Sequence, residues 1–106
     1  MFVAMNRFRV FEGKEEEFED LWRNRESRLG EMEGFVSFHL LRGPTSEGRT
    51  LYASHTIWES EAAFKAWTTS AHFRATHRNV GKSAEQTGAL YDGPPRFEGF
   101  RAVEGA

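Results

Sequence analysis

Apolar and polar residues alternate along residues 2–11, which is typical of a β-strand with one buried face. One face carries four apolar side chains: Phe2, Ala4, Phe8 and Val10. The other face is mixed: Val3, Met5, Arg7, Arg9 and Phe11. Asn6 interrupts the apolar face, and a buried carboxamide without hydrogen-bond partners costs about 1–3 kcal/mol. Asn6 is therefore either a working group of a site or an amide bonded to neighbouring backbone.

A helical pattern follows over residues 14–32, after a turn at Glu12 and Gly13. Its apolar residues share one helix face: Phe18, Leu21, Trp22, Leu29 and Met32. This stripe predicts a helix that packs on a sheet. Arg25 falls on the same stripe. Either its aliphatic stem covers apolar surface while the guanidinium reaches solvent, or it anchors a ligand carboxylate at the mouth of a pocket.

Three more strands are predicted. Residues 35–42 and 50–58 flank a polar loop at residues 43–48, which predicts a hairpin. The last strand covers residues 96–103. Before it, residues 79–88 have no periodicity and form either a lid over a pocket or a connection with no role.

Residues 60–78 read as two short helices in tandem. Ser60 is a good N-cap for the first helix and Ser70 for the second. The break between them falls at Thr68 and Thr69, because threonine is a poor interior residue of a helix.

This break matters for Trp67 and His77, which would lie on different faces of one straight helix. A bend lets both side chains line one cavity. Phe64 shares a face with Trp67, and Phe73 shares one with His77. Taken alone, the position of His77 is more typical of a core histidine that has one hydrogen-bond partner.

The order of elements, β-α-β-β-α-β, predicts an α+β, ferredoxin-like domain over residues 1–106, with both helical segments on one face of an antiparallel sheet. The other face is left bare. Two sheets paired across a two-fold axis would cover it, so a homodimer is expected.

Composition narrows the chemistry. Ten Phe, three Trp and two Tyr among 106 residues indicate an aromatic core or an apolar pocket for a flat ligand. The chain has no cysteine, which excludes disulfides, thiolate metal sites and a cysteine nucleophile. A net charge of −2 gives no reason to expect nucleic acid. No apolar window approaches a membrane span, and a cytoplasmic protein is expected.

Several site types are absent from the sequence. It has no Gly-rich phosphate loop and no nucleophile elbow. His72 and His77 are not at the i, i+4 spacing of a helical zinc site. What remains is Asn6, Trp67 and His77, each on an apolar face. This set suits a flat apolar cofactor whose metal needs one imidazole, and also an aromatic substrate oxidised without a cofactor.

Four stretches, FVAMNRFRV, GFVSFHLLRG, YASHTIWESEAAFKAW and FRATHR, resemble the IsdG-type heme-degrading monooxygenases. These enzymes belong to the antibiotic biosynthesis monooxygenase superfamily. The resemblance covers residues 2–78 with the order of elements intact. It implies a dimeric α+β barrel with one heme per subunit, in which heme is substrate as well as cofactor. It also implies O2 and electrons from a separate reductase.

The resemblance assigns roles to matching residues. His77 corresponds to the proximal iron ligand, and Asn6 to a hydrogen-bond donor on the distal side of the heme. Trp67 corresponds to the residue that presses the porphyrin out of its plane. Arg25 is implied near the heme propionates. The aromatic residues on the two helix faces are candidate cofactor contacts: Phe64 and Phe73.

Two alternatives stay open. One is a cofactor-free oxygenase acting on polycyclic aromatic substrates, which needs Asn6 and Trp67 but has no use for an imidazole at an iron site. The other is a heme-binding or storage module without turnover, in which His77 would also bind iron.

Overall fold

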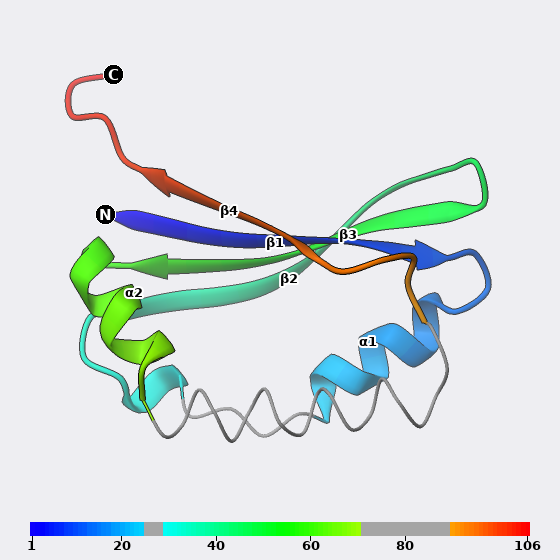
Figure 1. The fold of residues 1–106 in the computed structure, drawn as a ribbon, viewed down its shortest axis with the longest axis horizontal. Coiled ribbons are helices and arrows are strands. Elements are labelled where there is room, and N and C mark those ends of the chain that lie inside the picture. The colour runs from blue at the N-terminus through cyan, green and yellow to red at the C-terminus, as the bar shows by residue number, and fades with distance from the viewer. Residues whose placement is uncertain (25–28, 71–89) are drawn as a thin grey trace.

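The computed structural model describes residues 1–24, 29–70 and 90–106 and contains a four-stranded sheet with its helices on one side (Figure 1). The elements are β1 (Phe2–Phe11), α1 (Glu15–Arg23), the 3₁₀ helix η1 (Leu29–Glu31), β2 (Phe35–Ser46), β3 (Arg49–Trp58), α2 (Glu61–Thr68) and β4 (Arg96–Arg101). The sheet order is β2-β3-β1-β4, and every pair is antiparallel. The predicted ferredoxin-like α+β fold is confirmed.

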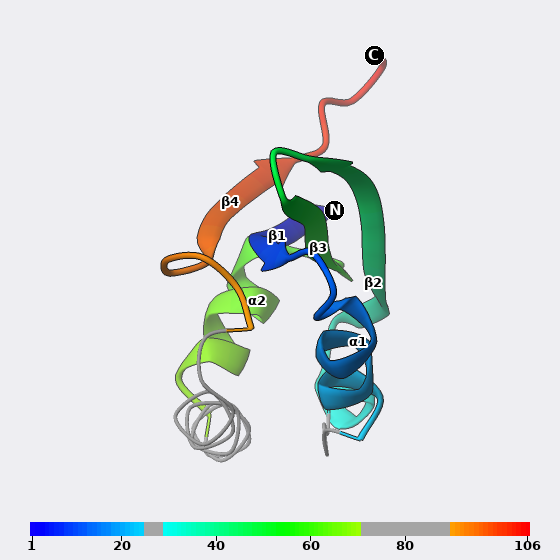
Figure 2. The ribbon, with the colours of Figure 1, turned by 90° about the vertical axis from the view of Figure 1, so that its right-hand side faces the viewer.

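The sheet arches over α1 and α2, which lie on the same side of it, α2 toward one end and α1 toward the other (Figure 1 and Figure 2). Two apolar clusters fill the space between. The cluster near α1 consists of Phe8, Val10, Phe18, Tyr52 and Leu90. The cluster near α2 and η1 consists of Phe2, Ala4, Leu29 and Trp58. The predicted alternation of β1 is confirmed, because its four inward apolar residues all belong to these clusters.

The predicted helix over residues 14–32 is too long. α1 ends at Arg23, and the backbone N–H of Asn24 bonds to the carbonyls of Asp20 and Trp22. Residues 25–28 lie outside the described residues. Leu29 then forms a 3₁₀ turn and is buried in the α2-side cluster, whereas Phe18 is buried in the α1-side cluster. One sequence stripe thus serves two separate clusters.

The predicted hairpin is confirmed, but its loop is shorter than residues 43–48. β2 continues to Ser46, and Thr45 bonds to Thr50 across the ladder at 2.7 Å. The chain reverses at Glu47 and Gly48, whose φ angles of 54° and 77° are those of a tight two-residue turn. At the other end of the chain, β4 stops at Arg101 instead of residue 103.

Helix α2 begins as predicted. The hydroxyl oxygen of Ser60 accepts a hydrogen bond from the backbone N–H of Ala63 at 3.1 Å. The helix ends at Thr68, where the break was expected. Gly34 permits close docking of this helix: its φ is 84°, and a Cβ there would lie 2.5 Å from the Cβ of Ala63.

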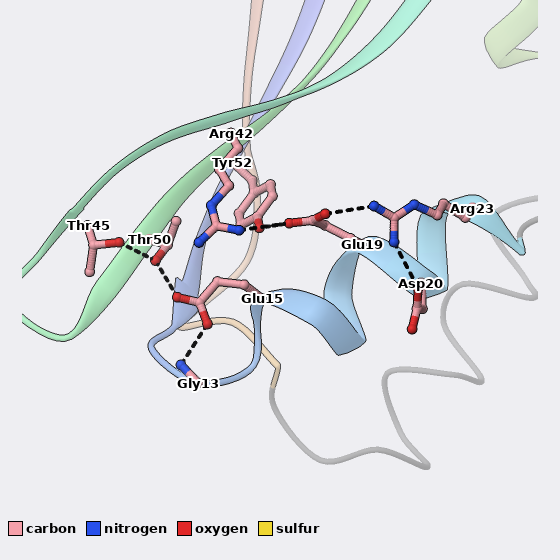
Figure 3. Close-up of polar contacts among 9 residues, drawn as sticks. All are labelled: Gly13, Glu15, Glu19, Asp20, Arg23, Arg42, Thr45, Thr50 and Tyr52. Atoms are coloured by element: carbon pink, nitrogen blue, oxygen red, sulfur yellow. Dashed lines mark hydrogen bonds and ion pairs between the residues drawn. The ribbon is translucent and has the colours of Figure 1, made fainter.

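Two carboxylates fix α1 to the sheet (Figure 3). Glu19 accepts a short hydrogen bond from the hydroxyl of Tyr52 and pairs with Arg23 and Arg42 at 2.9 and 3.2 Å. Glu15 accepts from the Thr50 hydroxyl at 2.8 Å. Burial raises the pKa of Tyr52 to about 12, and the bond to Glu19 acts in the same direction. That bond in turn lowers the pKa of Glu19.

The hydrogen bond between Tyr52 and Glu19 should make a measurable contribution to the free energy of unfolding. We expect Tyr52→Phe to lower the free energy of unfolding at pH 7 by about 1.5–3 kcal/mol, the usual contribution of a hydrogen bond to a charged group. Because the folded-state pKa of Glu19 is depressed, this stabilisation is present above the unfolded value, roughly 4.3, and is lost as the pH falls through the folded value.

Urea denaturation at pH 7 and at pH 3 checks this expectation. Tyr91→Phe is the matched control, because it removes a hydroxyl from the same aromatic cluster without touching Glu19. It should change stability by less than about 0.5 kcal/mol. Equal losses in the two variants would contradict the anchoring role.

Candidate functional site

A cavity of about 300 Å³ lies between the sheet and the helices. Every described helix and strand contributes to its lining: Ala4, Asn6, Trp22, Leu29, Phe38, Ser54, Thr56, Phe64, Trp67, Thr68 and Phe97. Most of these side chains are apolar, and five are aromatic. Its size lies at the lower end of the range of roughly 300–1,000 Å³ that ligand sites span.

Asn6 reaches this cavity from the middle of β1. It is half-buried and is paired in register with Ser54 on β3 and Phe97 on β4. The cavity thus receives the Asn6 side chain from a sheet position that has a neighbour on both sides. The backbone that carries the amide is thus held from both sides, which suits a group that must orient a bound ligand.

Trp67 and Phe64 face the cavity from α2. The Trp67 ring lies 5.7 Å from that of the fully buried Trp58. Phe64 stacks on Phe97 at 5.6 Å with an interplanar angle of 8°. Phe64 also packs against Phe2 at 5.2 Å. These ring contacts hold the aromatic walls against the sheet.

The lining includes no charged side chain among the described residues. Its polar groups are the Asn6 amide and the hydroxyls of Ser54, Thr56 and Thr68. Aromatic walls with a few convergent polar groups suit a flat, largely apolar ligand. Within residues 1–24, 29–70 and 90–106, no cluster of three or more His, Asp or Glu side chains could hold a metal ion.

The structure brings together three of the six predicted site residues: Asn6, Phe64 and Trp67. Arg25, Phe73 and His77 lie outside the described residues, as do His72 and the proposed lid at residues 79–88. Ligation of iron by His77 therefore stays a prediction.

The hydroxyl residues of β3 that line the cavity were not predicted from the sequence, and neither were three of its aromatic rings. Ser54 and Thr56 were predicted as strand residues only. The alternation along β3 could have identified them, because every second residue of this strand faces inward: Thr50, Tyr52, Ser54, Thr56 and Trp58. Three hydroxyl residues on a buried face are unusual, because buried polar groups cost free energy unless they are bonded. The missed rings are Trp22, Phe38 and Phe97.

Residues 1–79 match the antibiotic biosynthesis monooxygenase family, and the chain belongs to that family. It is 31% identical over 91 residues to a staphylobilin-producing heme oxygenase of Staphylococcus haemolyticus, a match that covers 82% of this chain and 83% of the relative. The resemblance found in the sequence is thereby confirmed.

Solved structures show the same fold. The heme-degrader MhuD of Mycobacterium tuberculosis, with hemes bound in its active site, has a TM-score of 0.69 and 25% identity over 100% of this chain and 99% of its own. SnoaB, a cofactor-independent oxygenase of Streptomyces nogalater, has a TM-score of 0.66 and 19% identity, covering 97% and 93% of the two chains. The second likeness shows the fold alone. No described helix is long and apolar enough to span a bilayer.

Proposed function

We propose that this protein is a heme-degrading monooxygenase that binds heme as substrate and cofactor and opens the porphyrin ring. The observation that carries the proposal is the meeting of Asn6, from the sheet, and Trp67, from α2, on one aromatic cavity. The identity to a heme oxygenase over most of both chains supports it. The cavity's apolar walls also fit a flat macrocycle.

The groups that would hold heme come from several elements. His77 is the proposed iron ligand, and Phe64 and Phe73 are proposed contacts of the ring. Arg25 is proposed to pair with a propionate, since guanidinium groups bind carboxylates in two parallel hydrogen bonds. Bound heme, with O2 and electrons from a separate reductase, supplies the oxidising chemistry and is itself consumed, which releases its iron.

The chain's own contribution is positioning. The Asn6 amide N–H is a neutral donor fixed on β1, and such donors act most strongly where negative charge develops during a reaction. The Trp67 indole packs against the buried ring of Trp58, so a ligand pressed against Trp67 meets a second ring behind it. We propose that this pressure bends the macrocycle and exposes its reacting edge.

Two other functions use parts of the same site. A cofactor-free oxygenase would use Asn6 and Trp67 on a polycyclic aromatic substrate, and a heme-storage module would use His77 without turnover. Hemin addition separates them: a Soret band that stays at the position of free hemin indicates the first, and a shifted, protein-bound band that persists with reductant and O2 indicates the second. The heme-degrading function predicts a band that appears and then decays.

The proposal includes a homodimer working in the cytoplasm beside its reductase. Its support is the sheet face opposite the helices, which no described element covers (Figure 2). Leu41 and Phe100 point to that face and are 43% and 47% exposed. They continue a half-buried apolar surface on β1 and β3 that includes Val3 and Ile57. Apolar faces of this kind mark association surfaces.

His77→Ala should weaken hemin binding and change the iron spectrum, because it removes the proposed ligand. The matched controls are His39→Ala, His55→Ala and His72→Ala, which should bind hemin like the wild type. Absorbance titration with hemin measures all four variants. Loss of the ligand spectrum in a different single variant would show that the site is assigned to the wrong histidine.

Asn6→Ala should bind heme almost normally but degrade it more slowly, by on the order of a hundredfold, as when one oxyanion donor is lost. The amide donor of Asn6 acts on the reaction and adds little to heme affinity, which His77 and the aromatic walls are proposed to supply. Heme titration and single-turnover decay on the same sample separate the two effects. Unchanged decay would remove Asn6 from the mechanism, and lost binding would make it a structural residue.

Sedimentation should report a dimer at micromolar concentration with or without heme. Leu41→Glu and Phe100→Glu should shift it toward monomer, because each buries a charge if two sheets pair. Val103→Glu is the control, since Val103 is already 76% exposed beyond β4. A wild-type protein that sediments as a compact, soluble monomer would contradict the paired-sheet arrangement.

A further inference from the structure

A second cavity, of about 390 Å³, lies beside the first. Its lining residues are Glu19, Trp22, Arg23, Phe38, Leu40, Arg42 and Tyr52. Among the described residues, the two cavities share two lining residues, Trp22 and Phe38. One residue comes from α1 and the other from β2, so the two side chains close the gap between helix and strand.

The two shared rings form a stack. Trp22 and Phe38 have ring centroids 5.8 Å apart and an interplanar angle of 17°. Two more rings hold the indole: Phe8 contacts it edge-on at 5.6 Å, and Phe18 lies at 6.1 Å with a tilt of 55°. Contacts with three aromatic neighbours restrict how far the Trp22 ring can swing aside.

Polar contacts fix the helix that carries Trp22. Glu19 lies three residues before Trp22 on α1 and bonds to Tyr52 and Arg42 of the sheet (Figure 3). The separation of Trp22 from the sheet is therefore set by a carboxylate and its partners as well as by packing.

The two sides of the stack differ in chemistry. The Asn6 side has no charged lining residue among those described, whereas the other side carries Glu19, Arg23 and Arg42. Glu19 pairs with Arg23 at 2.9 Å and with Arg42 at 3.2 Å. That second side also carries Leu40 and the Tyr52 ring, so among the described residues the stack separates a cavity without charged lining residues from one in which charged and apolar residues are mixed.

We propose that the stacked Trp22–Phe38 pair is the wall that ends the Asn6–Trp67 cavity and determines its specificity. The wall sets how far a planar macrocycle enters, and therefore which edge of that macrocycle lies beside Asn6. This inference rests on the proposed heme-degrading function. It makes Trp22 and Phe38 specificity-determining residues that limit ligand size and select the carbon at which the ring opens.

The test removes one aromatic ring of the wall at a time, from α1 in one variant and from β2 in another. Trp22→Leu and Phe38→Leu join the two cavities, while Trp22→Phe keeps an aromatic ring in the stack. Phe35→Leu is the matched control: it is a phenylalanine on the same strand that packs edge-on against Trp58 at 5.7 Å and is not among the cavity's lining residues. Thermal melts establish which variants are folded.

Two measurements are made on each folded variant. The first compares affinity for hemin with affinity for the bulkier iron tetra(4-sulfonatophenyl)porphyrin. Opening the wall should raise the relative affinity for the bulkier porphyrin on the order of tenfold, the lower range of discrimination by pocket fit. The second measurement is the isomer ratio of ring-opened products from hemin, reductant and O2. Both Leu variants should shift it, whereas Trp22→Phe and Phe35→Leu should keep the wild-type ratio.

The outcomes separate this inference from the function on which it rests. If the wild type binds both porphyrins but degrades neither, the proposed function is wrong. The affinity ratio then still tests whether the wall limits ligand size. If the wild type degrades hemin but a folded Leu variant keeps the wild-type affinity ratio and isomer ratio, the proposed role of the Trp22–Phe38 wall is wrong. The proposed function then stands. If Trp22→Leu does not fold, Phe38→Leu decides the question from the strand side.

Discussion

The carboxylate of Glu19, together with the packing of Phe18, sets where α1 lies on the sheet. It accepts the Tyr52 hydroxyl and pairs with two arginines, one on its own helix and one on β2. Tyr52 is 1% exposed, so its hydroxyl would be costly to leave without a partner. The position of α1 then sets the position of Trp22, and with it one boundary of the cavity. The candidate site therefore depends on a contact that none of its proposed catalytic groups makes.

The covered face of the sheet carries polar groups at positions where apolar residues would make the domain more stable. The inward face of β3 carries Thr50, Ser54 and Thr56, all buried, where valine or isoleucine would pack more favourably. Asn6 stands beside Ser54 in register. A sheet that accepts hydroxyls and an amide on its covered face gives up apolar contacts and gains fixed polar groups inside an aromatic site. Departures of this kind from ideal packing are expected at functional sites.

The local features of the fold were predictable from the sequence because they depend on neighbours in the chain. The alternation of β1 and the N-cap at Ser60 are of this type. The end of α1 at Arg23 was not predictable, because Leu29 continues the periodic stripe but is buried in a different cluster. Asn6, Phe64 and Trp67 were found because their residue types suit a site. Trp22 and Phe38 were not predicted as cavity residues. A periodic apolar pattern shows that a side chain is covered, but it does not show that a cavity lies beside that side chain.

Helix α2 has eight residues, and none of them is fully buried. Its attachment among the described residues comes from the partly exposed rings of Phe64 and Trp67 and from close docking at Gly34. Regions with few buried contacts open at a lower free energy than the whole domain. The amides of α2 should therefore exchange with deuterium sooner than those of β1 and β3, which form the centre of the sheet. The wall that carries Trp67 can thus be displaced while the sheet that carries Asn6 stays folded, so ligand exchange need not wait for global unfolding.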